Sequence, residues 1–549
     1  MSCLISLAAL GSCATDDSID AVDPVGTAIA EADPEAVLLF GIGLPRDDAG
    51  LAEFALAVSD PADPSYGDHV SAKEVGRRFG ADDDTVDPIL EMFADAGVDA
   101  TVDPSRALIS APMTVAQAAD MFETEFAVYE TGAGTQLIET VRPPTVPSGL
   151  QGAEEIIGFE EPVREPPVAD LRLVASAGSP GSAEEPCAEA MSVEAADLGD
   201  VFREYGIASL HDQGFTGAGR TAAVITVSTF DNRALDAYAS CFGTTLPPTA
   251  LHLVESGQPF PSTGEAAMDI ELLASVAPDL DRIDVFQTTA HGLAAPVFAL
   301  AAAIDPANTG GRPPDVISAS LGWCEQGIAD HVLDLLDHQL LVAAAIGSTI
   351  VSAAGNHGTA GCYPSSTARA PHFPASSPWS LAIGGTALAI GADGAVTEAV
   401  WNDGDTWAGG GGESVRYDLP GWQNTLGGAD GRRYPDLALF ADSALGYAVS
   451  YCPAPGECGW TALGGTSAAT PIAAGAIALV NQARASHGAG PVGLLAPVLY
   501  AAAESGELVA RDITDGDNRL FGHDCCDASV GFDQASGWGA PDFATIAAL

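Results

Sequence analysis

Short runs of consecutive apolar and β-branched residues alternate with helical segments through the C-terminal two-thirds of the chain. Continuous apolar runs, unlike alternating ones, indicate strands that are buried on both faces, as in a parallel sheet. Strands that alternate with helices predict a sheet that carries helices on both sides. We therefore predict a three-layer α/β/α domain, with its chemical groups at the carboxyl ends of the strands. The runs are residues 221–227, 282–286, 315–321, 349–354 and 380–384.

The N-terminal part has a different pattern, with helical spacing in residues 51–58 and 115–122 and a strand-like run at 107–112. Mixed helices and strands in a segment of this length predict a compact α+β domain. Residues 162–186 then change to Pro, Glu, Ala, Gly and Ser with little periodicity, which is typical of a linker. We therefore divide the chain into a leader (1–34), an α+β domain (35–165), a linker that is open to cleavage (166–189) and the α/β/α domain (190–549).

The charge balance is strongly acidic. The 549 residues include 75 Asp plus Glu against 20 Lys plus Arg, a formal net charge of −55, and the only lysine is Lys73. Such a surface repels nucleic acid, so we expect no nucleic-acid partner. A carboxylate-rich surface stays soluble in high salt or at low pH, and both habitats stay open. The hydrophobic fraction of 47% is enough for a large buried core.

The first residues read as an export signal. Residues 4–13 are an apolar stretch that ends in small residues and a cysteine. Within it, residues 10–13 (Leu-Gly-Ser-Cys) are similar to a bacterial lipobox, in which the cysteine becomes the lipidated first residue. No Lys or Arg precedes the stretch, so lipidation of Cys13 and plain secretion both stay open. We expect a bacterial protein that is secreted or held at the cell surface.

Cysteine usage agrees with export. Beyond Cys3 and Cys13 the chain has eight cysteines, an even number that suits disulfides in an oxidising compartment. Cys452 and Cys458 flank a short Pro-Gly loop, so we predict that they form a disulfide; the pattern does not connect the others. A zinc site is the competing interpretation, but the Cys-x-x-Cys spacing that it usually needs is absent.

Two short stretches carry the candidate chemistry. In residues 264–269, Glu265 and Asp269 lie four positions apart on a predicted helix, so one carboxyl can act on a reaction centre while the other orients it. In residues 464–471, Ser467 lies between a glycine pair and a proline, where a loop enters an apolar helix and the helix dipole is positive. Taken singly, the acidic pair could be a solvated helix face and the serine a turn residue.

The two stretches, Glu-x-x-x-Asp and Gly-Gly-Thr-Ser-x-x-x-Pro, resemble the motifs of the sedolisins, or serine-carboxyl peptidases. The chain is similar to the kumamolisin type, which has an N-terminal activation prodomain. The resemblance implies a subtilisin-like fold, an endopeptidase that acts on protein or peptide substrates, and a prodomain that inhibits and chaperones its own catalytic domain; we expect a monomer. Further family signatures follow in order at residues 61–69, 79–81, 372–386, 400–404 and 434–436.

By this resemblance, Ser467 is the nucleophile, Glu265 the general base and Asp269 the partner that orients Glu265. A glutamate base suits acidic conditions better than a histidine does, because its usual pKa is about 4.3. The family's third carboxylate, which donates to the oxyanion, is replaced here by Asn356. An amide donates at any pH, so the change keeps the chemistry and weakens the dependence on acid. The alternative is that Asn356 only favours a tight turn.

Two other functions share features with this sequence. A subtilisin-type serine peptidase needs a His-Gly-Thr-His motif that opens a helix and an aspartate after its first strand. This chain has His-Gly-Thr at 357–359, directly after the oxyanion position, and Thr-Val-Ser at 226–228, so we interpret His357 as a loop residue. A catalytically inactive sedolisin-fold binding protein would have lost one of the three proposed catalytic residues, and all three are present.

Residues 512–516, 529–533 and 536–541 resemble the family's calcium loop. Two carboxylates and several carbonyl oxygens held by glycine turns form the hard oxygen cage that calcium prefers. An acidic surface loop is the alternative. The resemblance implies one structural Ca²⁺ ion, bound by the side chains of Asp512 and Asp533 and by the carbonyl oxygens of Ile513, Ser529 and Gly531.

Overall fold

The structure is a computed structural model that describes residues 28–130, 136–150, 152–159, 186–254, 262–288, 294–390, 396–428, 430–454, 457–507 and 509–549. The lipobox-like residues 10–13 and most of the linker lie outside these ranges, so the predictions made for them are untested. None of the helices in these ranges has both the length and the apolar content of a membrane span.

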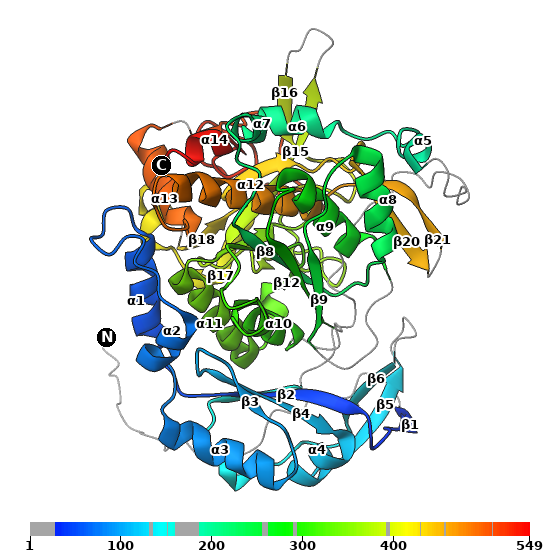
Figure 1. The fold of residues 1–549 in the computed structure, drawn as a ribbon, viewed down its shortest axis with the longest axis vertical. Coiled ribbons are helices and arrows are strands. Elements are labelled where there is room, and N and C mark those ends of the chain that lie inside the picture. Colours follow the sequence, from blue (N-terminus) through cyan, green and yellow to red (C-terminus); the bar gives the residue numbers. More distant parts are fainter. Residues whose placement is uncertain are drawn as a thin grey trace, which may run out of the picture.

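An eight-stranded sheet forms the centre of the C-terminal part (Figure 1). Strand β8 (Thr221–Thr226) lies in the middle, parallel to β10 (Arg282–Gln287) on one side and β11 (Val316–Ala319) on the other. The sheet continues from β11 through β13 (Thr349–Ala353) and β15 (Leu381–Ile390), which are also parallel. The five predicted strands are therefore confirmed. The remaining strands are β9 (Thr249–Leu253), β19 (Leu437–Phe440) and the antiparallel β16 (Val396–Val400).

Two pairs of helices cover the two faces of this sheet: α9 (Glu265–Val276) with α12 (Thr466–Ser486), and α10 (Ala295–Ile304) with α11 (Asp330–Ile346). Alternate residues of β8 point into the two cores, because side chains of a strand alternate between its faces. Ala222 and Val224 pack with α9 and α12, whereas Ala223 and Ile225 pack with α10 and α11. This arrangement is the predicted three-layer α/β/α fold.

The N-terminal part is an α+β domain with a core of its own, as predicted. The predicted strand at 107–112 overlaps β4 (Leu108–Thr114), and the predicted helix at 51–58 falls within α1 (Asp48–Ser59). The predicted helix at 115–122 is α4 (Val115–Met121), which begins at a capping box of Thr114 and Gln117. The other elements are β1 (Ala28–Glu31), β2 (Val37–Gly43), α2 (Ala72–Phe79), α3 (Asp83–Asp95), β3 (Thr101–Val102), β5 (Phe126–Glu130), β6 (Gln136–Thr140) and β7 (Glu155–Ile157).

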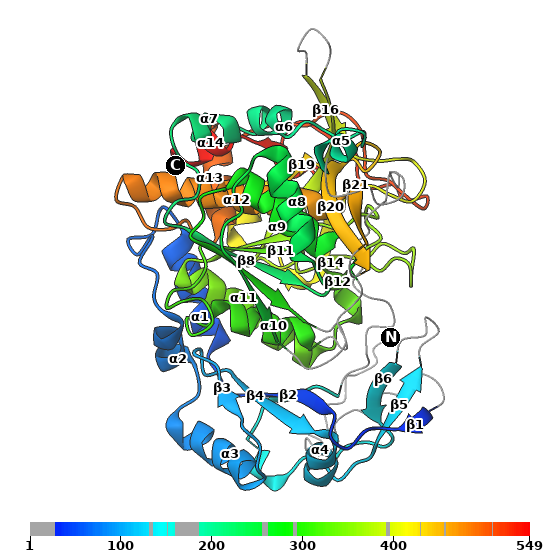
Figure 2. The ribbon, with the colours of Figure 1, turned by 45° about the vertical axis from the view of Figure 1, so that its right-hand side comes forward.

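The two domains share one of the cores. Leu51 of α1 and Val75 of α2 are buried in the same apolar cluster as Val332 and Leu336 of α11. Both views show α1 and α2 lying against the side of the larger domain that carries α11 (Figures 1 and 2). The N-terminal domain therefore docks on the helix layer that is opposite to α9 and α12.

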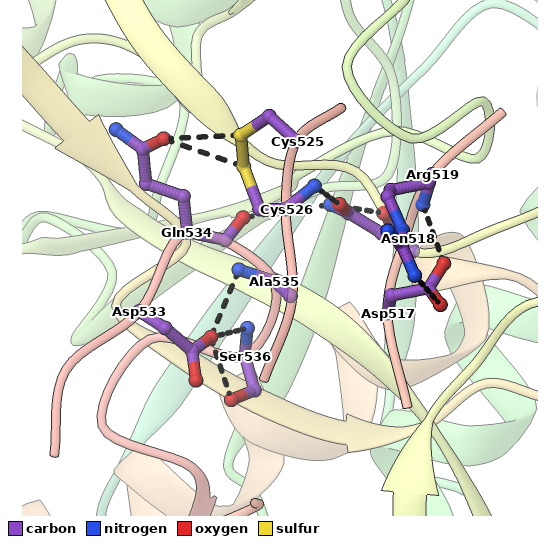
Figure 3. Close-up of a disulfide and its surroundings, with 10 residues drawn as sticks. Asp517, Asn518, Arg519, Cys525, Cys526, Asp533, Gln534, Ala535 and Ser536 are labelled. Carbon is purple, nitrogen blue, oxygen red and sulfur yellow. Dashed lines mark hydrogen bonds and ion pairs between the residues drawn. A yellow bond between two sulfur atoms is a disulfide. The ribbon is translucent and has the colours of Figure 1, made fainter. Parts of the chain in front are cut away.

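Cys452 and Cys458 form a disulfide, which confirms the predicted pair. Cys324 also bonds to Cys362, and Cys525 to its neighbour Cys526, two pairings that the sequence pattern left open. Figure 3 shows the Cys525–Cys526 disulfide beside Gln534 and Asn518; the Cys526 N–H donates to Asn518 Oδ1 at 2.8 Å. Cys525 and Cys526 lie between the first two segments of the predicted calcium loop.

Candidate active site

Helix α9 carries both predicted carboxylates. Eleven of its twelve residues are buried, since its apolar residues pack against both the sheet and α12. Gly264 precedes the helix with φ +94°, and a Cβ there would lie 3.0 Å from Leu463 Cδ1, so this position favours glycine. The exposed fraction is 6% for Glu265 and 0% for Asp269. The predicted helix face is thus a buried one, and the alternative of a solvated face is wrong.

Ser467 is the second residue of α12 and follows strand β21 (Glu457–Leu463) after a short glycine turn. Gly465 in this turn has φ +103°, and a Cβ there would lie 2.9 Å from Asn356 Nδ2, so a side chain does not fit. Ser467 is 2% exposed, and its Oγ donates to the carbonyl oxygen of Ser320 at 3.1 Å. The serine therefore lies at the predicted junction of loop and helix.

Ser320 links the nucleophile candidate to the carboxylates. It directly follows β11, and its Oγ donates to Asp269 Oδ1 at 2.7 Å while lying 3.0 Å from the Ser467 carbonyl oxygen. Sequence reasoning missed Ser320, although the rule that chemistry gathers at the carboxyl ends of parallel strands points to it. The structure thus joins Ser467 to Asp269 through one residue, and Glu265 lies one helical turn before Asp269.

Burial dominates the electrostatics of this helix face. It raises the pKa of the Asp269 carboxyl well above its usual range, and the hydrogen bond from Ser320 offsets only part of the effect. Two carboxyls on one buried face favour a single negative charge, because a second one would be desolvated beside the first. The arrangement can therefore keep a proton on Asp269, as a residue that orients a neighbouring base requires.

Asn356 lies beside the turn that leads to Ser467. Its Oδ1 accepts hydrogen bonds from the Thr466 N–H at 2.8 Å and from Thr466 Oγ1 at 2.9 Å. A backbone N–H can only donate, so the atom that faces it is the amide oxygen, and Nδ2 is fixed on the side of Gly465. The side chain is 5% exposed. Asn356 thus holds Thr466, the residue that directly precedes Ser467, and its amide nitrogen lies on the side of the glycine turn.

His357 lies in the loop after β13, as interpreted from the sequence. Its Nδ1 is 2.8 Å from the carbonyl oxygen of Thr406, and its ring packs against Tyr363 and Trp407. No helix begins at His357. The residue instead forms an isolated β-bridge with Ala408 and is followed by a turn. The arrangement differs from the helix-borne histidine that a subtilisin-type mechanism needs.

The segments that carry the predicted calcium ligands meet in the structure. Asp512 Oδ2 accepts a hydrogen bond from the Gly531 N–H at 2.9 Å, which ties the first segment to the second. Asp533 is 7% exposed, and its Oδ2 accepts from the Ser529 N–H at 2.7 Å. Its Oδ1 accepts from the backbone and the hydroxyl of Ser536 at 2.8 and 3.1 Å (Figure 3).

This donor set fits a calcium ion. Within the described residues, no hydrogen bond reaches the carbonyl oxygens of Ile513, Ser529 or Gly531. Together with the exposed carboxylate of Asp512, they are hard oxygen donors of the kind that calcium binds. Burial raises the pKa of Asp533 although several hydrogen bonds lower it, so a nearby cation would stabilise the ionised form. Asp533 also organises its own turn, a second role that the sequence did not indicate.

Comparisons with known proteins agree with this fold and site. A family model described as the pro-kumamolisin activation domain matches residues 26–158, and one described as the subtilase family matches residues 293–523. Sedolisin from Pseudomonas sp. (strain 101) is 27% identical over 529 residues, covering 92% of this chain and 85% of that protein. The chain belongs to the sedolisin family.

Other members of the sedolisin family show the same relationship. Kumamolisin from Bacillus sp. (strain MN-32) is 33% identical over 354 residues, which cover 60% of this chain and 59% of that protein. The structure of Pseudomonas sedolisin complexed with two molecules of pseudo-iodotyrostatin matches with 28% identity and a TM-score of 0.53, over 61% of this chain and 92% of that chain. This chain is accordingly a serine-type peptidase of the sedolisin family with an activation prodomain.

Proposed function

We propose that the protein is the proenzyme of an exported serine-carboxyl endopeptidase, in which Ser467 attacks the scissile carbonyl and Glu265 is the general base. The link from Ser467 through Ser320 to Asp269 is the observation that carries the proposal, because it joins a serine hydroxyl to the carboxyl of Asp269 in a buried site. Ionised Glu265 takes the proton of Ser467 Oγ as this oxygen attacks the carbonyl carbon. Asp269 keeps its own proton and orients Glu265.

Asn356 Nδ2 donates to the carbonyl oxygen as it becomes negative in the tetrahedral intermediate. When the C–N bond breaks, Glu265 returns the proton to the leaving amine, and the acyl group stays on Ser467 Oγ. A water molecule then attacks this ester while Glu265 accepts one of its protons. That proton returns to Ser467 Oγ as the ester bond breaks, which restores the starting state.

Cleavage of unstructured peptides tests this function. Matured protein is incubated with a library of long peptides, and the new termini are mapped by mass spectrometry. Cuts in the interior of the peptides are expected. The relatives of this chain include tripeptidyl-peptidase 1 of Rattus norvegicus, which is 26% identical over 583 residues. If the enzyme only releases tripeptides from the amino ends of the peptides, the endopeptidase assignment is wrong. If no new termini are found, the peptidase proposal is wrong.

We also propose that the enzyme works outside the bacterial cytoplasm as a monomer, secreted or anchored by a lipid at Cys13. The Cys452–Cys458 and Cys324–Cys362 disulfides support export, because such bonds persist in oxidising compartments. The net charge of −55 disfavours nucleic acid as a partner. Protein or peptide substrates and the enzyme's own prodomain, as inhibitor and chaperone, are the partners that this proposal requires.

A buried polar contact between the two domains supports a prodomain that acid releases. His338 of α11 is 1% exposed; its Nδ1 lies 2.6 Å from Asp48 Oδ1, and its Nε2 lies 3.0 Å from Ser105 Oγ, both in the prodomain. Arg46 Nε also donates to Asp48 Oδ2 at 2.9 Å. Burial raises the pKa of Asp48, but the hydrogen bonds and charges of His338 and Arg46 lower it further, so the net shift is downward.

The docked pKa of Asp48 is therefore below its value in a released prodomain. Its contribution to docking is present above the released value and is lost as the pH falls through the docked value. Asp48→Asn is expected to speed maturation of the full chain roughly 10-fold near neutrality and to flatten the pH dependence of maturation, since a charged hydrogen bond is worth about 1.5–3 kcal/mol. The rate is read from gels over a pH series.

The same series with Asp83→Asn is the control, because Asp83 is an exposed prodomain residue that pairs only with Arg106 among the described residues. Asp334 and Glu154 have pKa values raised by burial and so oppose the trend of Asp48. The single substitution isolates the contribution of Asp48 from theirs. Maturation of Asp48→Asn with the unchanged rate and pH profile would contradict the acid-release role.

The calcium site gives a separate prediction. Calcium stabilises the folded state by mass action, so chelation is expected to lower the melting temperature by about 5 °C when calcium had been present at ~100-fold its dissociation constant. Asp512→Asn should remove this difference; it is a sharper test than Asp533→Ala, because Asp533 also holds its own turn. The exposed Asp524→Asn is the control. An unchanged melting curve after verified metal removal would rule out the site.

A further inference from the structure

Helix α9 buries a third carboxyl that the mechanism does not use. Glu271 is 0% exposed and lies two positions after Asp269, which rotates it by about 200° to the opposite side of the helix. Burying a carboxyl away from a counter-charge is costly, and an apolar residue would be more stable in such a place. The sequence pattern gave no sign of this role, because Glu271 reads as one more polar residue on a helix.

The contacts of Glu271 lead back to the nucleophile. Its Oε2 accepts a hydrogen bond from the Ser450 N–H at 3.1 Å, whereas its Oε1 has no hydrogen-bond partner within the described residues. Ser450 belongs to β20 (Tyr447–Ala454), which forms a hairpin with β21 and pairs Ser450 with Trp460. Strand β21 then runs through the glycine turn into Ser467. Glu271 therefore ties the helix of the carboxylates to the hairpin that delivers the serine.

The same hairpin also packs on the start of α9. Leu463 and Tyr451 are the side chains nearest to Gly264, the residue directly before Glu265. The Cys452–Cys458 disulfide closes the far end of the hairpin. A shift of β20 away from Glu271 would thus move Ser467 and the helix start that carries Glu265 relative to each other. A displacement of about 1 Å can cost ~100-fold in rate.

The surroundings favour the neutral carboxyl. Burial raises the pKa of Glu271 well above its usual range, and the hydrogen bond from Ser450 lowers it only in part. On the neighbouring helix α8 (Asn232–Phe242), burial and then the Glu271 charge raise the pKa of Tyr238, whose hydroxyl lies 3.0 Å from Ser275 Oγ. Asp269 faces the other side of α9. None of these described groups supplies a positive charge to an ionised Glu271.

We propose that Glu271 is a positioning residue: its neutral carboxyl holds β20 so that Ser467 meets Glu265, and its ionisation sets an upper pH limit on activity. The inference rests on the proposed function of Ser467 and Glu265. A carboxyl whose pKa is higher in the folded state than in the unfolded state contributes its full stabilisation of the folded state when the pH is below the unfolded pKa. That stability is lost as the pH rises through the folded pKa.

Two substitutions separate position from charge. Glu271→Gln keeps the shape and the acceptor for Ser450 but cannot ionise. At acidic pH its kcat should stay within ~3-fold of the unmodified enzyme, and both its activity and its melting temperature should persist to a higher pH. Glu271→Leu removes the acceptor; its kcat should fall roughly 10- to 100-fold at acidic pH with little change in KM. Matured enzymes are compared by kcat, KM and thermal melting over the same pH series.

Asp284→Asn is the matched control, since Asp284 is 1% exposed and bonds to His252 and Arg282, away from the hairpin. It should lower the melting temperature without moving the upper pH limit. If Glu271→Gln loses activity and stability at the same pH as the unmodified enzyme, the inference is wrong, whether or not Glu271→Leu folds. The melting curves do not depend on catalysis, so they keep this failure distinct from a failure of Ser467 as the nucleophile.

Discussion

Ser467→Ala is expected to abolish peptide hydrolysis and also cleavage within residues 162–186 of the same chain. Without the hydroxyl, Glu265 has no nucleophile to deprotonate, and loss of a catalytic serine costs about 10⁶-fold in kcat in the subtilisin example. Hydrolysis is measured with the peptide library, and self-cleavage by gel and intact mass after purification. Both activities should fall together, because one site performs both.

The matched control is Ser486→Ala, at the far end of the same helix, where the hydroxyl donates to the carbonyl oxygen of Ala483 and lies 3.4 Å from His487 Nδ1. It should mature and cleave peptides normally. A Ser467→Ala chain that still matures unaided at the normal rate would show that another protease does the processing or that Ser467 is not the nucleophile. Hydrolysis of the peptides by that variant would decide between these two.

Asn356→Asp is expected to narrow the pH range of the enzyme. An aspartate donates to the oxyanion only while it is protonated, whereas the amide donates at any pH. The variant should match the unmodified enzyme in acid and fall behind it near neutrality by roughly 10²- to 10³-fold, the cost of losing one oxyanion donor. The comparison uses matured enzymes, since release of the prodomain has a pH dependence of its own.

Two further variants complete this test. Asn356→Ala should lose activity at every pH, because it removes the donor entirely. Asn481→Asp introduces a buried carboxyl on the same helix as Ser467, about 21 Å further along, and should leave the pH range unchanged. If the pH–activity profiles of Asn356→Asp and the unmodified enzyme superimpose, and Asn356→Ala is fully active, then Asn356 only stabilises a turn.

The fold was predictable where strands are buried on both faces. Strands such as β8 and β13 consist of continuous apolar runs because helices cover both sides of them. The pattern did not predict β9, whose residues are half-buried or exposed at the sheet edge. It also missed β19, a run of four residues that is too short to be told from a loop. The local sequence pattern indicates well which strands are buried. It says little about which distant segments pair with the edge strands of the sheet.

The site was predictable to the extent that its residues form local motifs. Glu265 and Asp269 share a helix face by their spacing, and Ser467 is marked by its glycine turn. Ser320 and Glu271 carry no such mark, because their roles depend on contacts with segments between 51 and 179 residues away. The physical reason is that a serine after a strand and a glutamate on a helix are both common in sequences. Only the tertiary contacts around such a residue give it a particular role.

The sheet also separates the helix layer on which the prodomain docks from the helices that carry the proposed catalytic residues. The prodomain docks against α11, whereas Ser467, Glu265 and Asp269 belong to helices on the other face. Departure of the prodomain therefore exposes α11 to water and leaves the packing between α9 and α12 intact. Side chains of α11 must suit two environments during the life of one molecule, and so must Arg484 near the end of α12, which donates to the Tyr66 hydroxyl of the prodomain at 3.2 Å. The packed interior between α9 and α12 must suit only one. Selection for release and selection for catalysis can thus act on separate sets of positions, even within the alternating residues of a single strand.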